Sequence, residues 1–191
     1  MRARHPICWL MTDERLGDGL WDALERLPRG AGVVFRHHAT PSGERRRLFA
    51  KVARVARARG LVLVRAGAVR MRGEQGVHKR RGAGLVTWPA HDRREAVAAV
   101  RAGARVVFVS PLFATRSHPG APALGKARAA TIARGLPVTA IALGGMDARR
   151  WRDVRALGFD GYAAIDAWLL TRRDGGDCHD ARRQKRKAVP T

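Results

Sequence analysis

The chain has 191 residues, of which 46% are hydrophobic, and a formal net charge of +22. The apolar fraction excludes an intrinsically disordered chain, and the length favours one domain with a sizeable core. Such a charge is typical of nucleic-acid-binding proteins, but the arginines are scattered along predicted helix faces, as at 45–47, 93–94 and 149–150, so we expect no nucleic-acid partner.

The sequence contains no segment suited to a membrane or to export. No apolar run approaches the roughly 18 residues that a spanning helix needs. The apolar stretch before Asp13 is also too short for the core of a secretory leader. We therefore expect a cytoplasmic location and no membrane partner.

Short apolar runs recur along the chain, rich in Val, Ile and Leu and without the polar alternation of a half-exposed sheet. This pattern is typical of parallel strands that are buried on both faces. The predicted strands are residues 7–11, 33–36, 61–64, 76–78, 85–88, 106–109, 138–143 and 161–165.

Amphipathic stretches separate these runs and predict helices. Ser42, Asp92 and Asp147 each precede such a stretch and are predicted N-caps. Residues 68–73 are too few for a proper helix, so we expect a loop or a single turn there. The predicted helices are residues 18–27, 43–59, 93–102, 126–133 and 148–157.

This alternation predicts an α/β fold, a (β/α)8 TIM barrel over residues 1–171 with a shortened fourth helical segment. The alternative is an open doubly wound sheet, but no Gly-x-Gly-x-x-Gly follows the first strand, where a dinucleotide-binding fold would place it. Residues 172–191 are polar, charged and without periodicity, and we expect a disordered basic tail.

The loops after the strands of a barrel converge on one face, its mouth, and this face carries the function. Cations and hydroxyls predominate there and carboxylates are few, so the mouth should attract anions, phosphate above all. Gly144-Gly145 before a helix suits a phosphate held by backbone N–H groups. The strand-end residues are Arg36-His37-His38, Arg65, residues 78–81, Thr87, Ser110, Gly144-Gly145 and Ile165-Asp166.

Five segments carry a resemblance to a known family. They are WLMTD at the first strand, GVH at the fourth, SPLFATRSHPGAPALG after the sixth, AIALGGM at the seventh and GFDGYAAIDA at the eighth. In this order, from residue 9 to about residue 167, they resemble the thiamine-phosphate synthase family, which includes the thiazole tautomerases. The loop after the sixth strand is the most specific of the five.

The resemblance implies a transferase that condenses hydroxymethylpyrimidine pyrophosphate with thiazole phosphate and releases pyrophosphate. Its partners would be these phosphorylated pyrimidine and thiazole substrates, and a homodimer is left open. Strand parity with Arg36 selects His38 over His37. The predicted catalytic residues are Arg36, Ser117 and His118, and the predicted substrate-binding residues are His38, Thr87, Ser110, Thr115, Gly144, Gly145, Ile165 and Asp166.

Three positions depart from the family pattern. Of Gln-x-Arg-x-Lys on the second strand only Arg36 is kept, Arg65-Ala66 replaces Asn-Asp, and residues 79–82 lack the expected aspartate. We therefore predict no metal ligands in the protein, and Mg²⁺ only through the pyrophosphate of the substrate. Two alternatives follow: a tautomerase-like or non-catalytic thiazole phosphate binder that has lost the pyrophosphate site, and, more remotely, a basic nucleic-acid-binding protein.

Overall fold

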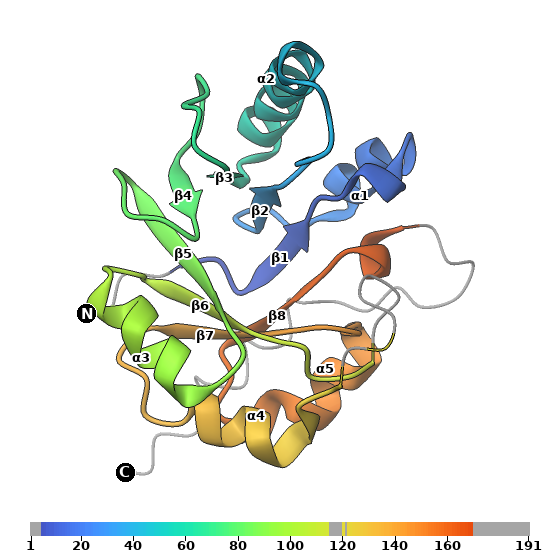
Figure 1. The fold of residues 1–191 in the computed structure, drawn as a ribbon. Helices are drawn as coiled ribbons and strands as arrows, with labels where there is room; N and C mark the ends of the chain where they lie inside the picture. Colours follow the sequence, from blue (N-terminus) through green and yellow to red (C-terminus); the bar gives the residue numbers. More distant parts are fainter. Residues whose placement is uncertain (1–4, 115–119, 121, 170–191) are drawn as a thin grey trace, which may run out of the picture.

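Eight parallel strands close into a barrel in chain order, with β8 beside β1 (Figure 1). The structure is a computed structural model that describes residues 5–114, 120 and 122–169. The predicted TIM barrel is confirmed. Its strands are β1 (Cys8–Met11), β2 (Gly32–Phe35), β3 (Val62–Ala66), β4 (Gly76–His78), β5 (Leu85–Ala90), β6 (Val106–Val109), β7 (Thr139–Leu143) and β8 (Gly161–Ala164).

Helices cover the outside of the barrel where the connections are long enough. The connections before and after β4 are exceptions. Residues 67–75 and 79–84, all of them described, form loops without a helix. The sequence predicted one shortened segment, and the structure has two helix-free connections. The helices are α1 (Gly19–Arg26), α2 (Ser42–Arg59), α3 (Arg93–Arg101), α4 (Gly125–Ala133) and α5 (Ala148–Val154), with short 3-10 turns η1 (Glu14–Leu16), η2 (Arg155–Leu157) and η3 (Asp166–Trp168).

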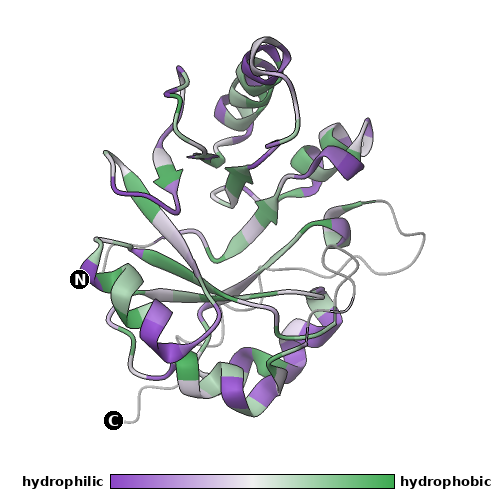
Figure 2. Ribbon diagram, viewed as in Figure 1, coloured by the Kyte–Doolittle hydropathy of each residue, from purple (hydrophilic) through white to green (hydrophobic). Residues whose placement is uncertain are grey.

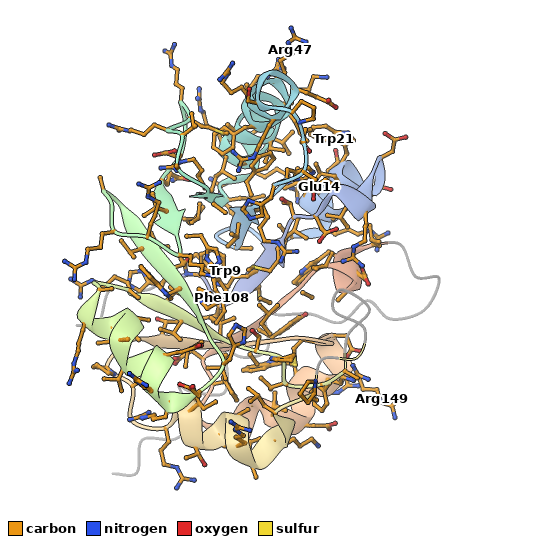
Figure 3. All side chains as sticks on the ribbon, viewed as in Figure 1. Trp9, Glu14, Trp21, Arg47, Phe108 and Arg149 are labelled. Carbon is orange, nitrogen blue, oxygen red and sulfur yellow. The ribbon has the colours of Figure 1, made fainter. Side chains whose placement is uncertain are left out.

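Successive strand residues alternate between two apolar layers, which explains the continuous apolar runs in the sequence. In β6, Phe108 belongs to the cluster inside the barrel, whereas Val107 and Val109 belong to the cluster under the helices. Inside, Trp9 meets Phe108 edge to face at 5.2 Å (Figure 3). Gly32 is paired with Trp9, and a Cβ at Gly32 would lie 2.2 Å from the indole, so only glycine leaves room for this ring.

Hydropathy follows this layering (Figure 2). The strands are largely apolar, and the polar residues gather on the outward faces of the helices. Over the described residues, no helix has both the length and the apolar content required to cross a membrane.

Two local predictions were wrong. Strand β5 continues through Pro89 to Ala90, paired with β6, whereas the sequence ended it at residue 88. Proline has no N–H for the ladder and therefore reads as a strand end. Ser42 is the first residue of α2 rather than its N-cap, and no side chain caps this helix. Asp92 and Asp147 do accept hydrogen bonds from Glu95 N–H and Arg150 N–H, each at 2.7 Å.

Candidate functional site

Arg36, directly after β2, is held at the mouth by β1. Its Nε donates to the Thr12 carbonyl and its Nη2 to Asp13 Oδ2, each at 2.9 Å. Burial would raise the pKa of Asp13, but hydrogen bonds from Arg15 and the charges of Arg36 and Arg15 lower it overall. Burial lowers the pKa of Arg36, against the charge of Asp13. The side chain is 21% exposed, so a fixed guanidinium faces the opening.

The two histidines that follow Arg36 have different surroundings. His37 stacks on Phe35 with ring centroids 4.7 Å apart, and its Nδ1 lies 2.9 Å from Thr12 Oγ1. This buried ring therefore belongs to the packing outside the barrel. His38 is exposed, and burial of part of its ring, with the charges of Arg45 and Arg36, lowers its pKa. Strand parity had selected His38, and the structure leaves that ring the more accessible of the two.

Arg45, on α2, binds the main chain at the ends of β2 and β3. Its Nε donates to His37 O at 2.8 Å, and its Nη2 donates to Arg36 O at 3.0 Å and to Ala66 O at 2.7 Å. The residue is only 9% exposed. One guanidinium thus satisfies carbonyl groups that a strand-to-loop transition leaves without a ladder partner. Sequence analysis missed this residue because it counted Arg45 among the arginines scattered along helix faces.

Arg65, which the sequence placed among the cations of the mouth, forms an ion pair with Glu74 instead. It also donates to the carbonyl of Gly67. Strand alternation explains the difference, because the next residue, Ala66, belongs to the interior cluster and is 2% exposed. The end of β3 therefore presents a buried methyl group to the mouth, and no carboxylate.

His78, the last residue of β4, forms the floor of the mouth. Its Nδ1 lies 2.9 Å from Thr87 Oγ1, and its ring is 5.7 Å from that of Phe108. Burial lowers the pKa of His78 to about 3, with smaller contributions from the charges of Arg36, His38 and Lys79. The imidazole is therefore neutral at neutral pH. Thr87, which the sequence placed at the end of a strand, is fully buried in the middle of β5, where it contacts His78.

Ser110 follows β6 and is 9% exposed. The carbonyl of Ser110 accepts a hydrogen bond from His91 Nδ1 at 2.8 Å, and the His91 N–H donates to Glu95 Oε2 at 2.7 Å. His91 thus ties the end of β5 to the start of the loop after β6. Sequence analysis did not single it out, although its position directly after β5 was a usable signal.

The turn at Gly144-Gly145 packs against the loop after β6. Leu112 N–H donates to Leu143 O at 2.9 Å, and Phe113 N–H donates to Gly144 O at 3.1 Å. Gly144 has φ +97°, and a Cβ there would lie 2.6 Å from Pro111 Cα. Both the backbone conformation and the close approach therefore require glycine. The loops after β6 and β7 form one continuous part of the rim.

Arg150, in the first turn of α5, adds a cation to this turn. It donates to the carbonyl of Gly145 and lies 4.8 Å above the ring of Phe113. Ile165 and Asp166 follow β8 at the same rim and are half-buried. Thr115, Ser117 and His118 lie outside the described residues.

The carboxylates near the mouth do not suit a resident Mg²⁺ ion. Asp13 is bound to Arg36 and Arg15. Glu14 accepts a hydrogen bond from Ala39 N–H at 2.8 Å. Within residues 5–114, 120 and 122–169, no group of three or more His, Cys, Asp or Glu side chains could hold a metal ion. Magnesium prefers oxygen ligands, chiefly carboxylates and phosphates, and Asp13 and Glu14 already accept hydrogen bonds from groups of this chain.

The fold is a closed TIM barrel of eight parallel strands, and guanidinium groups of Arg36 and Arg150 lie at its rim. The family model described as "Thiamine monophosphate synthase" matches residues 64–168, more than half of the chain. The chain belongs to this family, as its sequence motifs predicted.

Individual relatives agree with this assignment. A thiamine-phosphate synthase of Chloroflexus aurantiacus is 37% identical over 79 residues, which make up 41% of this chain and 37% of that protein. The chain therefore aligns with little more than a third of this curated relative.

Solved structures show the same barrel. The thiamine phosphate pyrophosphorylase from Pyrococcus furiosus is similar with a TM-score of 0.73 and 20% identity, covering 84% of this chain and 86% of that one. The protein of the same name from Bacteroides thetaiotaomicron gives a TM-score of 0.55 and 19% identity, with 85% and 83% covered. At these identities the likeness concerns the fold.

Proposed function

We propose that this chain is a thiamine phosphate synthase, a transferase that condenses hydroxymethylpyrimidine pyrophosphate with thiazole phosphate. The observation that carries the proposal is the arrangement of the rim. A fixed guanidinium, Arg36, lies at one side of the mouth, and the Gly144-Gly145 turn, joined to the loop after β6, lies at the other. Two anion-binding features on one mouth suit two phosphorylated substrates.

The proposed reaction is a dissociative substitution. The bond between the pyrimidine methylene carbon and the pyrophosphate oxygen breaks, and pyrophosphate leaves with the electron pair. The thiazole nitrogen then donates its lone pair to the resulting carbocation and forms the new carbon–nitrogen bond. The protein accelerates such a step by holding the leaving group in a cationic environment and by aligning the nucleophile.

The proposed roles follow the positions at the rim. Arg36 would contact the pyrophosphate. The proposed catalytic roles of Ser117 and His118 rest on the resemblance of their sequence segment to the family. The turn at Gly144-Gly145 would hold the thiazole phosphate. His78 is neutral, so it would contribute hydrogen bonding rather than charge, and Thr87 would orient it. The remaining proposed substrate contacts are His38, Ser110, Thr115, Ile165 and Asp166.

The test is a synthase assay on the purified chain with both substrates, with and without Mg²⁺. We expect thiamine phosphate as product and a loss of at least about 100-fold in kcat/KM for Arg36→Ala, because a charge-assisted contact to a leaving phosphate contributes about 1.5 to 3 kcal/mol and more in a shielded site. Arg47→Ala is the matched control, since Arg47 lies on the exposed side of α2 (Figure 3) and should leave the rate unchanged.

Binding measurements distinguish the synthase from the two alternative functions. If no product forms although thiazole phosphate binds, the chain is a tautomerase-like or non-catalytic binder and the synthase proposal is wrong. If neither substrate binds but RNA does, with a steep dependence on salt, the chain is a nucleic-acid-binding protein.

A further inference from the structure

We infer that the mouth binds the diphosphate group of its substrate directly with cationic side chains at the ends of β2 and β4, without a bridging divalent metal ion. This inference rests on the proposed function, because it concerns how the same site holds the leaving group. It departs from the usual use of a cation such as Mg²⁺ to hold a diphosphate.

The first observation is that two acids at or beside the ends of β1 and β3 are already paired with guanidinium groups. Asp13 is bound by Arg36 and Arg15, and Glu74 is bound by Arg65 and by Met71 N–H at 2.9 Å. A divalent ion would have to compete with a guanidinium for each of these carboxylates. At the end of β3 the interior-facing residue is Ala66, which has no ligand atom in its side chain.

The second observation is a set of cations around the same floor. Arg36 follows β2, and Lys79 and Arg80 follow β4, two strands further around the barrel. Lys79 directly follows His78 in the chain, and Arg36 directly follows β2 at the same face of the barrel. Within the described part of the chain, no carboxylate forms an ion pair with Lys79 or Arg80, whose side chains are exposed.

The third observation is the backbone at Lys79. Its φ is +57°, a left-handed conformation that a non-glycine residue adopts at a cost. The conformation is held by a hydrogen bond of 2.9 Å from Lys79 N–H to Thr87 O. Arg80 is held in turn, since its Nη1 donates to Gly67 O at 3.3 Å. Hydrogen bonds therefore anchor Lys79 and Arg80, the two cations at the start of the loop after β4.

These cations can perform the charge neutralisation that a metal ion would otherwise supply. Guanidinium groups bind phosphate oxygens through paired N–H donors, and an ammonium group acts as a compact charge. As the carbon–oxygen bond breaks, negative charge grows on the departing pyrophosphate, and fixed cations stabilise it without any redox step or further reactant.

The experiment is isothermal titration calorimetry of the full chain with inorganic pyrophosphate, in buffer with EDTA and in buffer with Mg²⁺. We expect one site in EDTA, with a Kd that changes less than about threefold when Mg²⁺ replaces the chelator. In the double variant Lys79→Asn, Arg80→Gln, the Kd should rise about 10- to 100-fold, which corresponds to the loss of a charge-assisted contact. Asn is chosen at position 79 because it tolerates the left-handed backbone.

The matched control is Lys51→Asn, Arg101→Gln, which removes the same two charges from exposed positions on α2 and α3. An equal loss in the control would show that the high net charge alone attracts pyrophosphate, and would overturn the inference. Binding that requires Mg²⁺ would also overturn it. In that case product formation in the synthase assay would still support the proposed function, so the two proposals can fail separately.

Discussion

The two halves of the barrel mouth hold their strand ends by different means. Around β2 and β3, side chains do so: Arg45 donates to carbonyls at both strand ends, and Arg65 pairs with Glu74. Around β6 and β7, main chain binds main chain, through Leu112 N–H to Leu143 O and through the close turn at Gly144.

The two halves of the mouth also differ in how far the family model covers them. The family match begins at residue 64, in β3, and runs to η3, so it contains the half in which the backbone makes the contacts. A backbone turn constrains its own sequence directly, because only glycine fits. A side-chain contact to a carbonyl can be made by different donors from different elements, so the chemistry of the first half is freer to change.

The largest effect is expected at the backbone turn. Gly144→Ala should lower the free energy of unfolding by about 2 to 5 kcal/mol, from the left-handed backbone and from overlap with Pro111. Urea unfolding measures it. The control is Gly158→Ala, where φ is +95° and a Cβ would meet nothing within 4 Å, so only about 1 to 2 kcal/mol should be lost. Equal losses would show that the close packing of the two loops contributes nothing.

The side-chain half should be sensitive to Arg45. Arg45→Met keeps much of the apolar stem but removes the donors to Arg36 O, His37 O and Ala66 O, and should lower the free energy of unfolding by about 2 to 4 kcal/mol. Arg46→Met, at the exposed neighbouring position, should change it by less than about 0.5 kcal/mol. Denaturant unfolding of the two variants side by side makes the comparison, and similar values would remove the proposed role of Arg45.

The buried imidazole of His78, at the floor of the mouth, should make the free energy of unfolding depend on pH. His78 has a folded pKa of about 3 against 6.5 unfolded, so between these values the unfolded chain binds more protons. Stability should therefore fall as the pH falls from 6.5 towards 3, with a slope from this residue of up to about 1.4 kcal/mol per pH unit. His78→Gln should show a shallower loss when unfolding is measured at pH 7.5, 6, 5 and 4. Parallel curves for both proteins would contradict the neutral, buried imidazole.

The smallest expected effect concerns the N-terminal caps of two helices, α3 and α2. Asp92→Ala removes the cap of α3 and should cost about 1 kcal/mol, because Glu95 N–H loses its acceptor. Ser42→Ala, at the start of α2, should cost less than about 0.5 kcal/mol, since Ser42 makes no side-chain cap. Thermal unfolding detects the difference. A larger cost at Ser42 than at Asp92 would reverse the assignment of caps.

Sequence analysis placed Arg36, Ser110 and Gly144 at strand ends correctly, because the rule that loops after strands meet at one face needs only the strand positions. It missed Arg45, His91 and Arg150, whose partners are main-chain carbonyl groups of distant or adjoining loops. Apart from the position of His91 directly after a strand, no local pattern marks which carbonyl groups will need a donor once the strands are assembled.

Two properties were readable from the chain alone: the order of strands and helices, and the excess of cations over acids at the strand ends. Both are local, since periodicity and charge depend on neighbouring residues only. The tertiary structure decided which cations reach the mouth. Arg65 and Arg36 each lie at the end of a strand, yet the alternation of side chains within the closed barrel directs Arg65 to Glu74 and leaves Arg36 at the opening, held by Asp13 from the adjacent strand end. That outcome depends on barrel closure and on contacts between residues distant in the sequence.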